Sequence, residues 1–266
     1  MSQTANGEAS VTVEQREHIL LMGLNRPAKR NAFNLDMLLS LGRAYERLER
    51  DDDLRCGVLF AHGEHFTGGL DLAEVGPKRA EGTFNYPQDA RDPWRNDGKP
   101  WTKPVIAAVQ GWVMTLAIEL LLAADIRIAS SDARFAQLEI QRGIYPFGGA
   151  TMRLPREAGW GNAMRWLLTG GEYDAEEAHR IGLVQEVVEP GRQLDRAVEL
   201  ADYISTRSAP LGVRTTLLSA QRTLNEGEAA AARRLVFDMV ALLNTDDGRE
   251  GMMSFIERRE ARFVGR

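Results

Sequence analysis

Short apolar runs alternate with longer amphipathic segments along most of the chain. Apolar runs bounded by turn residues are typical of buried strands, and apolar residues recurring every three or four positions are typical of helices. By this pattern the strands are predicted at 11–16, 18–24, 56–61, 104–109, 126–129 and 183–188. Helices are predicted at 34–50, with Asn34 as N-cap, and at 161–169 and 174–181. Two further helices are predicted to begin at Asp71 and within 143–151. This recurrence predicts stacked ββα turns of a spiral, or a parallel α/β sheet.

From Gly191 onward the pattern becomes almost wholly helical, with helices predicted at 192–206, 209–224, 227–243 and 247–259. We therefore expect an α/β core over residues 11–200, a helical module over 201–266 and a disordered polar tail over 1–10. An apolar stripe in the module fits either an oligomer interface or core within one chain. It consists of Leu235, Val236, Met239, Val240 and Leu243.

The segment 110–126 follows the strand at 104–109 and predicts a helix that is apolar on every side. Such a helix is typically buried. Glu119 lies in its first turns, where an ionised carboxylate is costly unless it is paired or used. Burial would raise its pKa toward the range useful for proton transfer at neutral pH. The alternative is a half-solvated Glu that the helix dipole stabilises.

Composition narrows the classes of function. The 266 residues are 44% hydrophobic and 27% charged, which suffices for one large core. The net charge of -5 and the pI of about 5.6 disfavour nucleic acid as the main partner. The single Cys56 excludes an internal disulfide framework, and no Cys/His spacing indicates a metal site. No apolar run reaches the length of a membrane helix, and the polar start lacks a signal-peptide core, so we expect a cytoplasmic protein without a membrane partner.

Residues 76–102 are the least regular stretch, with several prolines among aromatic residues. This pattern fits a lid or pocket wall, and it fits equally a surface loop packed by its own aromatics. Elsewhere the chain lacks the Gly-x-Ser-x-Gly motif of serine hydrolases and the glycine-rich loops of nucleotide-binding folds. A serine triad, nucleotide redox chemistry and phosphoryl transfer are therefore disfavoured.

Several segments, in this order, resemble the crotonase superfamily of enoyl-CoA hydratases and isomerases over residues 11–263. They are 24–32, 65–72, 103–111, 119–126, Phe135–Glu139 with Gly143, 168–170 with 178–184, and 255–263. The resemblance implies an α/β fold of the crotonase-like spiral type, built of repeated ββα units. It also implies a C-terminal helical module that serves in oligomerisation and covers the active site, in a homotrimer or a dimer of trimers.

The resemblance further implies an enolate whose oxygen is stabilised by two backbone N–H groups, each typically contributing about 3 kcal/mol. The donors it points to are Gly68, which would also lie against the CoA thioester, and Leu116 at the start of the buried helix. The sequence departs from the family here, because Thr115-Leu116-Ala117 stands where Gly-Gly-Gly is usual. We therefore expect less space than usual around these two amides, and we expect Phe147 to narrow the same pocket further.

Glu119 and Glu139 fall on the family's two acid/base positions, as in its hydratases. With the resemblance, we assign Glu119 to activate water and Glu139 to donate a proton to Cα, or the two to share these roles. The alternative for Glu139 is an ordinary surface residue on a strand edge. Arg26, the backbone of Ala28, and Lys29 lie in the loop that would run past CoA. Arg259 could reach CoA phosphates from the same or a neighbouring subunit, or simply be solvated.

These features together predict an enoyl-CoA hydratase that adds water to the 2,3-double bond of an acyl-CoA, with no metal and no cofactor beyond the CoA of the substrate. Two alternatives stay open. One is an isomerase or hydrolase of the same fold, acting on an acyl-CoA or a diketone. The other is a non-catalytic acyl-CoA binding protein. The presence of both glutamates favours the hydratase.

Overall fold

The structure, a computed structural model, describes residues 9–80, 85–97 and 101–266, apart from the side chains of 78–80. Most of the predicted tail, residues 1–8, lies outside this description. Within the described chain, one large sheet has the strand order β1-β2-β3-β4-β6-β9. Only β1 and β2 pair in antiparallel fashion, and all the other neighbours are parallel. The strands are β1 (Val11–Arg16), β2 (Ile19–Leu24), β3 (Cys56–Ala61), β4 (Val105–Val109), β6 (Ile126–Ser130) and β9 (Glu186–Val188).

A second layer runs beside the large sheet and repeats with it. Its strands are β5 (Trp112–Met114), β7 (Arg134–Ala136) and β8 (Tyr173–Asp174). Isolated bridges between Phe33 and Leu70 and between Thr67 and Val113 extend the same layer toward the N-terminus. Each turn of chain thus places one strand in the large sheet and one short extended piece in the second layer. A helix or helical turn follows, which confirms the predicted spiral of ββα units.

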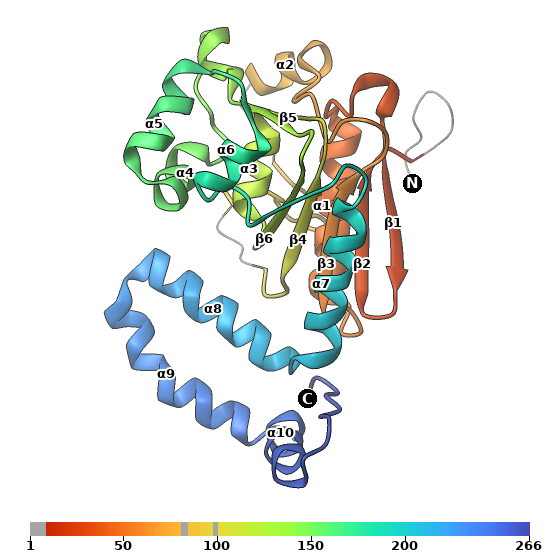
Figure 1. The fold of residues 1–266 in the computed structure, drawn as a ribbon, viewed down its shortest axis with the longest axis vertical. Helices are drawn as coiled ribbons and strands as arrows, with labels where there is room; N and C mark the ends of the chain where they lie inside the picture. The colour runs from red at the N-terminus through yellow and green to blue at the C-terminus, as the bar shows by residue number, and fades with distance from the viewer. Residues whose placement is uncertain (1–8, 81–84, 98–100) are drawn as a thin grey trace.

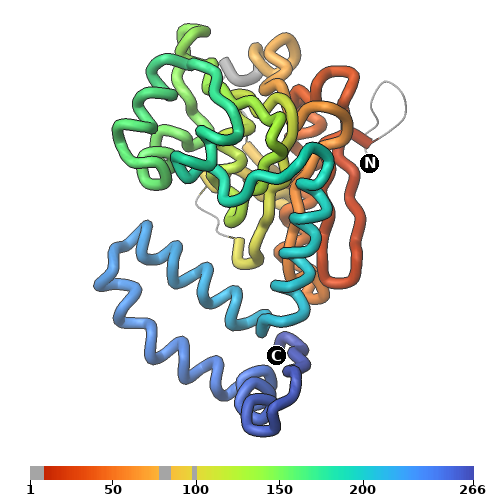
Figure 2. The backbone as a smooth tube through the Cα atoms, in the orientation of Figure 1, coloured from red at the N-terminus to blue at the C-terminus, as the bar shows by residue number. Residues whose placement is uncertain are grey.

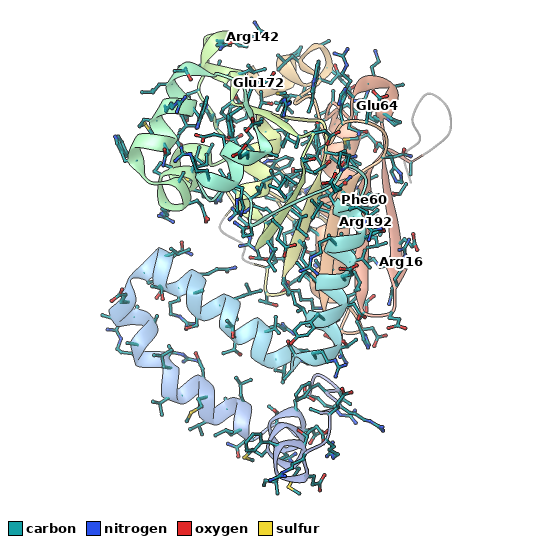
Figure 3. The ribbon with its side chains drawn as sticks, in the orientation of Figure 1. Arg16, Phe60, Glu64, Arg142, Glu172 and Arg192 are labelled. Atoms are coloured by element: carbon teal, nitrogen blue, oxygen red, sulfur yellow. The ribbon has the colours of Figure 1, made fainter. Side chains whose placement is uncertain are left out.

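Helices cover both faces of the large sheet (Figure 1). One face, with Leu20, Met22 and Leu59, packs against α1 (Leu35–Arg50) and α3 (Leu116–Ala123). Alternate residues on the same strands point the other way, because side chains alternate along a strand. Ile19, Leu21, Cys56 and Val58 therefore pack against α7 (Gln193–Arg207), and Figure 3 shows Phe60 of β3 beside that helix. The remaining helices of this body are α2 (Leu72–Ala80), α4 (Ala150–Ala158), α5 (Trp160–Thr169), α6 (Ala175–Arg180) and the 3₁₀ turns η1 (Pro27–Lys29) and η2 (Leu138–Arg142).

The C-terminal helices leave the body. In Figure 2, α8 (Pro210–Glu226) and α9 (Glu228–Leu243) form an antiparallel pair that projects away from the sheet, and α10 (Asp246–Glu257) follows. The stripe Leu235, Val236, Met239, Val240 and Leu243 is 43–69% exposed in the single chain. This stripe is therefore not core within one chain, which excludes one of its two interpretations. No helix in the described ranges combines the length and apolarity that crossing a membrane requires.

The structure agrees with most predicted elements and corrects a few. Asn34 caps α1 as expected, since its side chain accepts a hydrogen bond of 3.0 Å from the Met37 amide. The strand predicted at 183–188 is only β9 (Glu186–Val188). The sequence pattern missed β5 (Trp112–Met114), a strand too short to show a period.

Candidate active site

Glu119 is buried within α3, the helix that the sequence predicts to be apolar on every side. Its side chain is 1% exposed, and every residue of α3 is buried. The Oε1 atom accepts hydrogen bonds from the amides of Gly148 at 2.6 Å and Ala150 at 3.1 Å, where α4 begins. Burial raises the pKa of Glu119 to about 7, against the opposing effect of these amides and of Arg153. The half-solvated alternative for Glu119 is therefore wrong.

Glu139 lies in η2 and is 6% exposed, so it is not a surface residue on a strand edge. Its Oε1 atom accepts a hydrogen bond of 3.1 Å from Gln137 Nε2. Its buried Oε2 atom has no hydrogen-bond partner among the described residues. Burial raises the pKa of Glu139 to about 7, and the negative charge of Glu119 raises it further. The two carboxyl groups are thus close enough to influence each other's ionisation.

The backbone amides of Leu70 and Leu116, near Glu119, have no hydrogen-bond partner among the described residues. Leu116 is the first residue of α3, where N–H groups lack partners in the helix and the dipole favours negative charge. The loop that contains Leu70 is joined to β5, because Thr67 N–H donates to Trp112 O at 2.9 Å and Met114 N–H donates to Thr67 O at 3.1 Å.

The approach of the Leu70 loop to the start of α3 is very close. Gly69 has φ +108, and a Cβ atom added there would lie 2.5 Å from Thr115 Oγ1. Only glycine fits this position, since it needs both the positive φ and the missing side chain. The two free amides therefore come from chain segments that touch through Gly69 and Thr115.

Gly68, the donor that the resemblance implied, has another partner. Its N–H donates to the Arg30 carbonyl at 2.8 Å, and the Asp71 N–H donates to Phe33 O at 2.9 Å. Both amides face the segment 30–33, whereas the Leu70 amide between them does not. The structure therefore leaves the Leu70 amide, and not the Gly68 amide, without a partner in this loop. Residue type carries no signal for this choice, because every residue except proline has an amide.

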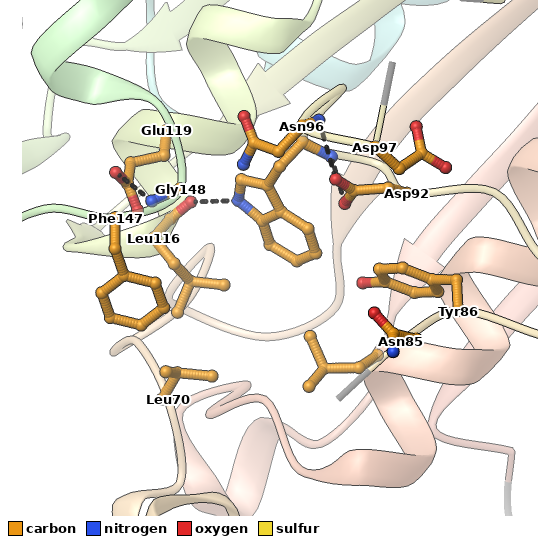
Figure 4. A pocket seen from close by; sticks show the side chains of 12 residues that line it. Leu70, Asn85, Tyr86, Asp92, Asn96, Asp97, Leu116, Glu119, Phe147 and Gly148 are labelled. Atoms are coloured by element: carbon orange, nitrogen blue, oxygen red, sulfur yellow. Dashed lines mark hydrogen bonds between the residues drawn. The ribbon is translucent and has the colours of Figure 1, made fainter. Parts of the chain in front are cut away.

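A cavity of about 260 Å³ lies beside these groups. Figure 4 shows Leu70, Leu116, Phe147 and Glu119 on one side of it. Leu116 lines the cavity without filling it, and Phe147 takes the position expected to narrow it. The opposite side comes from residues 85–97, where Trp94 Nε1 donates to Leu116 O at 3.0 Å. Within the segment 76–102, residues 85–97 therefore form part of a pocket wall.

The predicted CoA residues do not share one environment. Arg26 is held inside the protein, because its guanidinium donates to the Ala32 carbonyl and pairs with Asp71 at 3.3 Å. Ala28 is exposed and lines a hollow of about 420 Å³ together with Arg30 and His65. Arg30 and His65 were not expected at this site from the sequence.

Lys29 ends η1 and is exposed. Arg259 follows α10, at the end of the molecule away from α3 (Figure 1), and pairs with Glu250 and Glu257. A contact between Arg259 and CoA, from the same or a neighbouring subunit, therefore stays a prediction. In the described ranges, no three His, Cys, Asp or Glu side chains come together as a metal site would require.

Comparison with known proteins decides the family. The family model described as enoyl-CoA hydratase/isomerase matches residues 14–266. The chain belongs to this family. Its relatives in the enoyl-CoA hydratase/isomerase family include the enoyl-CoA hydratase EchA19 of Mycobacterium tuberculosis, 36% identical and covering 99% of both chains. The 2,3-dehydroadipyl-CoA hydratase of Escherichia coli is 32% identical and covers 97% of this chain and 100% of its own.

Solved structures of enoyl-CoA hydratases and isomerases are also similar to this chain. A probable enoyl-CoA hydratase/isomerase from Mycobacterium abscessus is 50% identical and matches with a TM-score of 0.94, over 97% of this chain and 99% of its own. An enoyl-CoA hydratase from Mycobacterium tuberculosis is 34% identical, with a TM-score of 0.87 over 97% of this chain and 100% of its own. The enoyl-CoA hydratase/isomerase fold therefore extends over nearly the whole chain.

Proposed function

We propose that this protein is an enoyl-CoA hydratase, which adds water across the 2,3-double bond of an acyl-CoA thioester. One observation carries the proposal: two buried carboxyl groups, each with a pKa raised to about 7, lie near a pair of unpartnered backbone amides. Family membership and the names of relatives, several of them hydratases of enoyl-CoA esters, support it.

The amides of Leu70 and Leu116 stabilise the charge that develops on the thioester oxygen. When a nucleophile adds to Cβ, electrons move toward the carbonyl and an enolate forms. Backbone donors fixed before the reaction need no reorganisation, and the loss of one such donor typically costs about 3 kcal/mol. The N-terminal end of the α3 dipole adds to this effect.

The two glutamates divide the proton transfers. Glu119, ionised and fixed by the Gly148 and Ala150 amides, takes a proton from water as the water oxygen bonds to Cβ. Glu139, protonated, gives its proton to Cα. One proton enters the pair as another leaves it, so transfer from Glu119 back to Glu139 restores the starting state. Two interacting carboxyls with pKa values near neutrality suit this sharing of a single proton.

The rest of the substrate extends beyond these groups. We place part of the CoA in the hollow lined by Ala28, Arg30 and His65, with no metal and no further cofactor.

The stripe on α9 would join subunits into a homotrimer or a dimer of trimers, and we place the enzyme in the cytoplasm. Co-localisation with a cytoplasmic marker in a fractionated or imaged cell tests the last point.

Hydration of crotonyl-CoA, followed as loss of the absorbance of the conjugated thioester, tests the proposal. Glu119→Gln and Glu139→Gln should each lower kcat by about two to four orders of magnitude. Glu172→Gln is the matched control, because this side chain is 61% exposed (Figure 3). The wild-type rate should peak near neutral pH, since activity needs one carboxyl ionised and the other protonated.

Three results would contradict the proposal. Activity that survives both Glu→Gln changes would exclude the two-carboxyl mechanism. Binding of crotonyl-CoA without turnover would favour the non-catalytic alternative. Turnover of a 3-enoyl-CoA to the conjugated isomer, without hydration, would favour the isomerase.

A further inference from the structure

Trp94 is a large side chain of the cavity wall that contacts the first turn of α3. It is 5% exposed, and its Nε1–H donates to the Leu116 carbonyl at 3.0 Å, a bond that a dashed line marks beside Leu116 in Figure 4. Leu116 also supplies one of the two amides assigned to the thioester oxygen. The indole therefore binds the carbonyl of a residue whose N–H is part of the proposed site.

The first turn of α3 needs a contact from outside the helix. Thr115 has φ 54 and ψ -116, and its side chain makes no capping hydrogen bond. A conformation of this kind persists only where the surrounding structure holds it. The bond from Trp94 restrains Leu116, the residue that directly follows the strained one.

The indole also contacts the support of the Leu70 amide. Its ring and that of Phe33 form a T-shaped pair, with 5.6 Å between the centroids and 72° between the planes. Phe33 in turn holds the neighbouring loop, because its N–H donates to Gly69 O at 2.8 Å and its carbonyl accepts from the Asp71 N–H at 2.9 Å. One side chain therefore contacts the supports of both amides.

The backbone of Trp94 is held by the turn around it. Asp92 accepts from the Trp94 N–H at 3.0 Å through Oδ1 and from the Asn96 N–H at 2.8 Å through Oδ2. Arg153 of α4 donates to the Arg95 carbonyl and to Asn96 Oδ1, each at 3.2 Å. The indole thus extends from a turn that is hydrogen-bonded to α4, so it can resist movement of Leu116.

We propose that Trp94 is a positioning residue of the reaction, which holds the Leu116 and Leu70 amides in the arrangement that one thioester oxygen needs. It does so through its indole N–H and through its contact with Phe33. The inference rests on the proposed hydratase function and on the assignment of these amides within it. Positioning matters because donors fixed in advance need no reorganisation, and a small misplacement can lower the rate about a hundredfold.

The test removes the indole N–H of Trp94. Trp94→Phe keeps an aromatic ring beside Phe33, and benzothienylalanine at position 94 keeps the whole shape, with sulfur in place of the N–H. Trp101→Phe is the matched control, because Trp101 is also buried and its Nε1 has no hydrogen-bond partner in the part of the chain that the structure describes.

Hydration of crotonyl-CoA gives the first readout. Both changes at position 94 should lower kcat about tenfold to a hundredfold, while KM changes less than about threefold. Trp101→Phe should leave kcat within about threefold of the wild type, since it removes an N–H that makes no such bond.

The second readout needs no turnover. Butyryl-CoA has no double bond to hydrate, and hydrogen bonds to its thioester carbonyl lower the stretching frequency of that bond. Isotope-edited infrared spectra of bound butyryl-CoA, labelled at the carbonyl carbon, should show this lowering in the wild type and in Trp101→Phe. The changes at position 94 should make it smaller.

The outcomes separate this inference from the proposed function. An unchanged kcat and carbonyl frequency with benzothienylalanine would overturn the inference and leave the hydratase function intact. An equal loss of kcat in Trp101→Phe would overturn it by indicating a general loss of packing, and a rise in KM alone would indicate only a contact with the acyl chain. A wild type that does not hydrate crotonyl-CoA would overturn the hydratase function, and the infrared comparison would still decide whether Trp94 sets the hydrogen bonds to the carbonyl.

Discussion

At the scale of single residues, the site buries two carboxyl groups, although a charged carboxylate is more stable in water. Glu119 and Glu139 are 1% and 6% exposed, and burial is the first cause of both raised pKa values. A carboxyl group whose pKa is raised in the folded state is destabilised there when it ionises. The placement that suits proton transfer at neutral pH therefore costs folding stability.

We expect Glu119→Gln and Glu139→Gln to raise the thermal midpoint Tm above pH 8. The native pKa of each group, about 7, exceeds its ordinary value of 4.5, so between these values the native state binds more protons than the unfolded state. The free energy of unfolding therefore falls as pH rises through this window and stays low above it. Each variant should gain a few degrees in Tm at pH 8.5 and lose less on the change from pH 6 to pH 8.5. Calorimetry at both pH values measures this, and an unchanged or lower Tm at pH 8.5 would contradict it.

Thr115 shows how one residue can occupy a position that favours glycine. The residue has φ 54 and ψ -116 just before α3, although its side chain is β-branched. A non-glycine residue in such a region typically costs about 1–3 kcal/mol. The loss of glycine at this point therefore strains the loop without removing its turn. The Leu116 amide keeps its place at the start of the helix.

At the scale of elements, loops that are distant in sequence position one another at the site. Arg26 links the loop after β2 to the Leu70 loop, through the Ala32 carbonyl and Asp71. Arg153 of α4 links Gly148 to the 95–96 segment, since it donates to Gly148 O at 3.3 Å and to Arg95 O at 3.2 Å. These contacts hold the loop of the Leu70 amide, to which we assign the oxyanion, and the Gly148 residue whose amide donates to Glu119.

We expect Arg26→Met to lower kcat about tenfold or more, with a smaller change in KM. The loss of the guanidinium leaves Asp71 unpaired and loosens the adjacent Leu70 amide, and small misplacements of a catalytic group are costly. Arg26→Lys should recover part of the rate. Arg16→Met is the control, because Arg16 is 53% exposed and lies at the end of β1, at the edge of the molecule in Figure 3. A rise in KM alone would instead indicate that Arg26 contacts CoA directly.

Strong periodicity made most elements predictable from the sequence. The helix predicted at 161–169 is Trp160–Thr169, and that predicted at 209–224 is Pro210–Glu226. Elements of two or three residues, such as β5 and β8, contain less than a period of pattern and depend on tertiary pairing. The buried state of Glu139 likewise depends on packing around a 3₁₀ turn, which a single sequence does not show.

Site residues that act through their side chains were predictable from the sequence. Those that act through a backbone N–H were less predictable, because the direction of the N–H depends on the fold. Glu119 and Glu139 follow from residue type within recognisable segments. The choice between the amides of Gly68 and Leu70 depends on which N–H turns toward Arg30, and three-dimensional pairing settles that. Whether the guanidinium of Arg26 faces solvent or Asp71 is decided by the same kind of contact.

At the scale of the whole molecule, the C-terminal helices have apolar surfaces that nothing covers in a single chain. Large apolar side chains of α9 and α10 are exposed, including Val236 at 69%, Phe237 at 63% and Phe255 at 86%. Monomeric proteins rarely expose contiguous apolar patches of this kind. Burial against a second copy would remove them from water and would fix the projecting α8–α9 pair.

We expect the wild-type protein to be a trimer or a multiple of a trimer, and Val236→Asp to shift it toward monomer. A carboxylate within the stripe would have to be buried without a partner in such an interface, which is unfavourable. Light scattering coupled to size exclusion measures the mass, with Glu172→Gln as the control. A monomeric wild type, or an unchanged mass for the variant, would contradict the expectation.

The contacts proposed for the thioester oxygen come from main-chain atoms of residues 70 and 116. Substitution of either leucine by anything other than proline leaves an N–H in place. Substitution of these two side chains can therefore change the shape of the acyl cavity and still keep the N–H groups that the reaction uses. A fold with this separation is well suited to acquire new substrates by point mutation, without first losing its reaction.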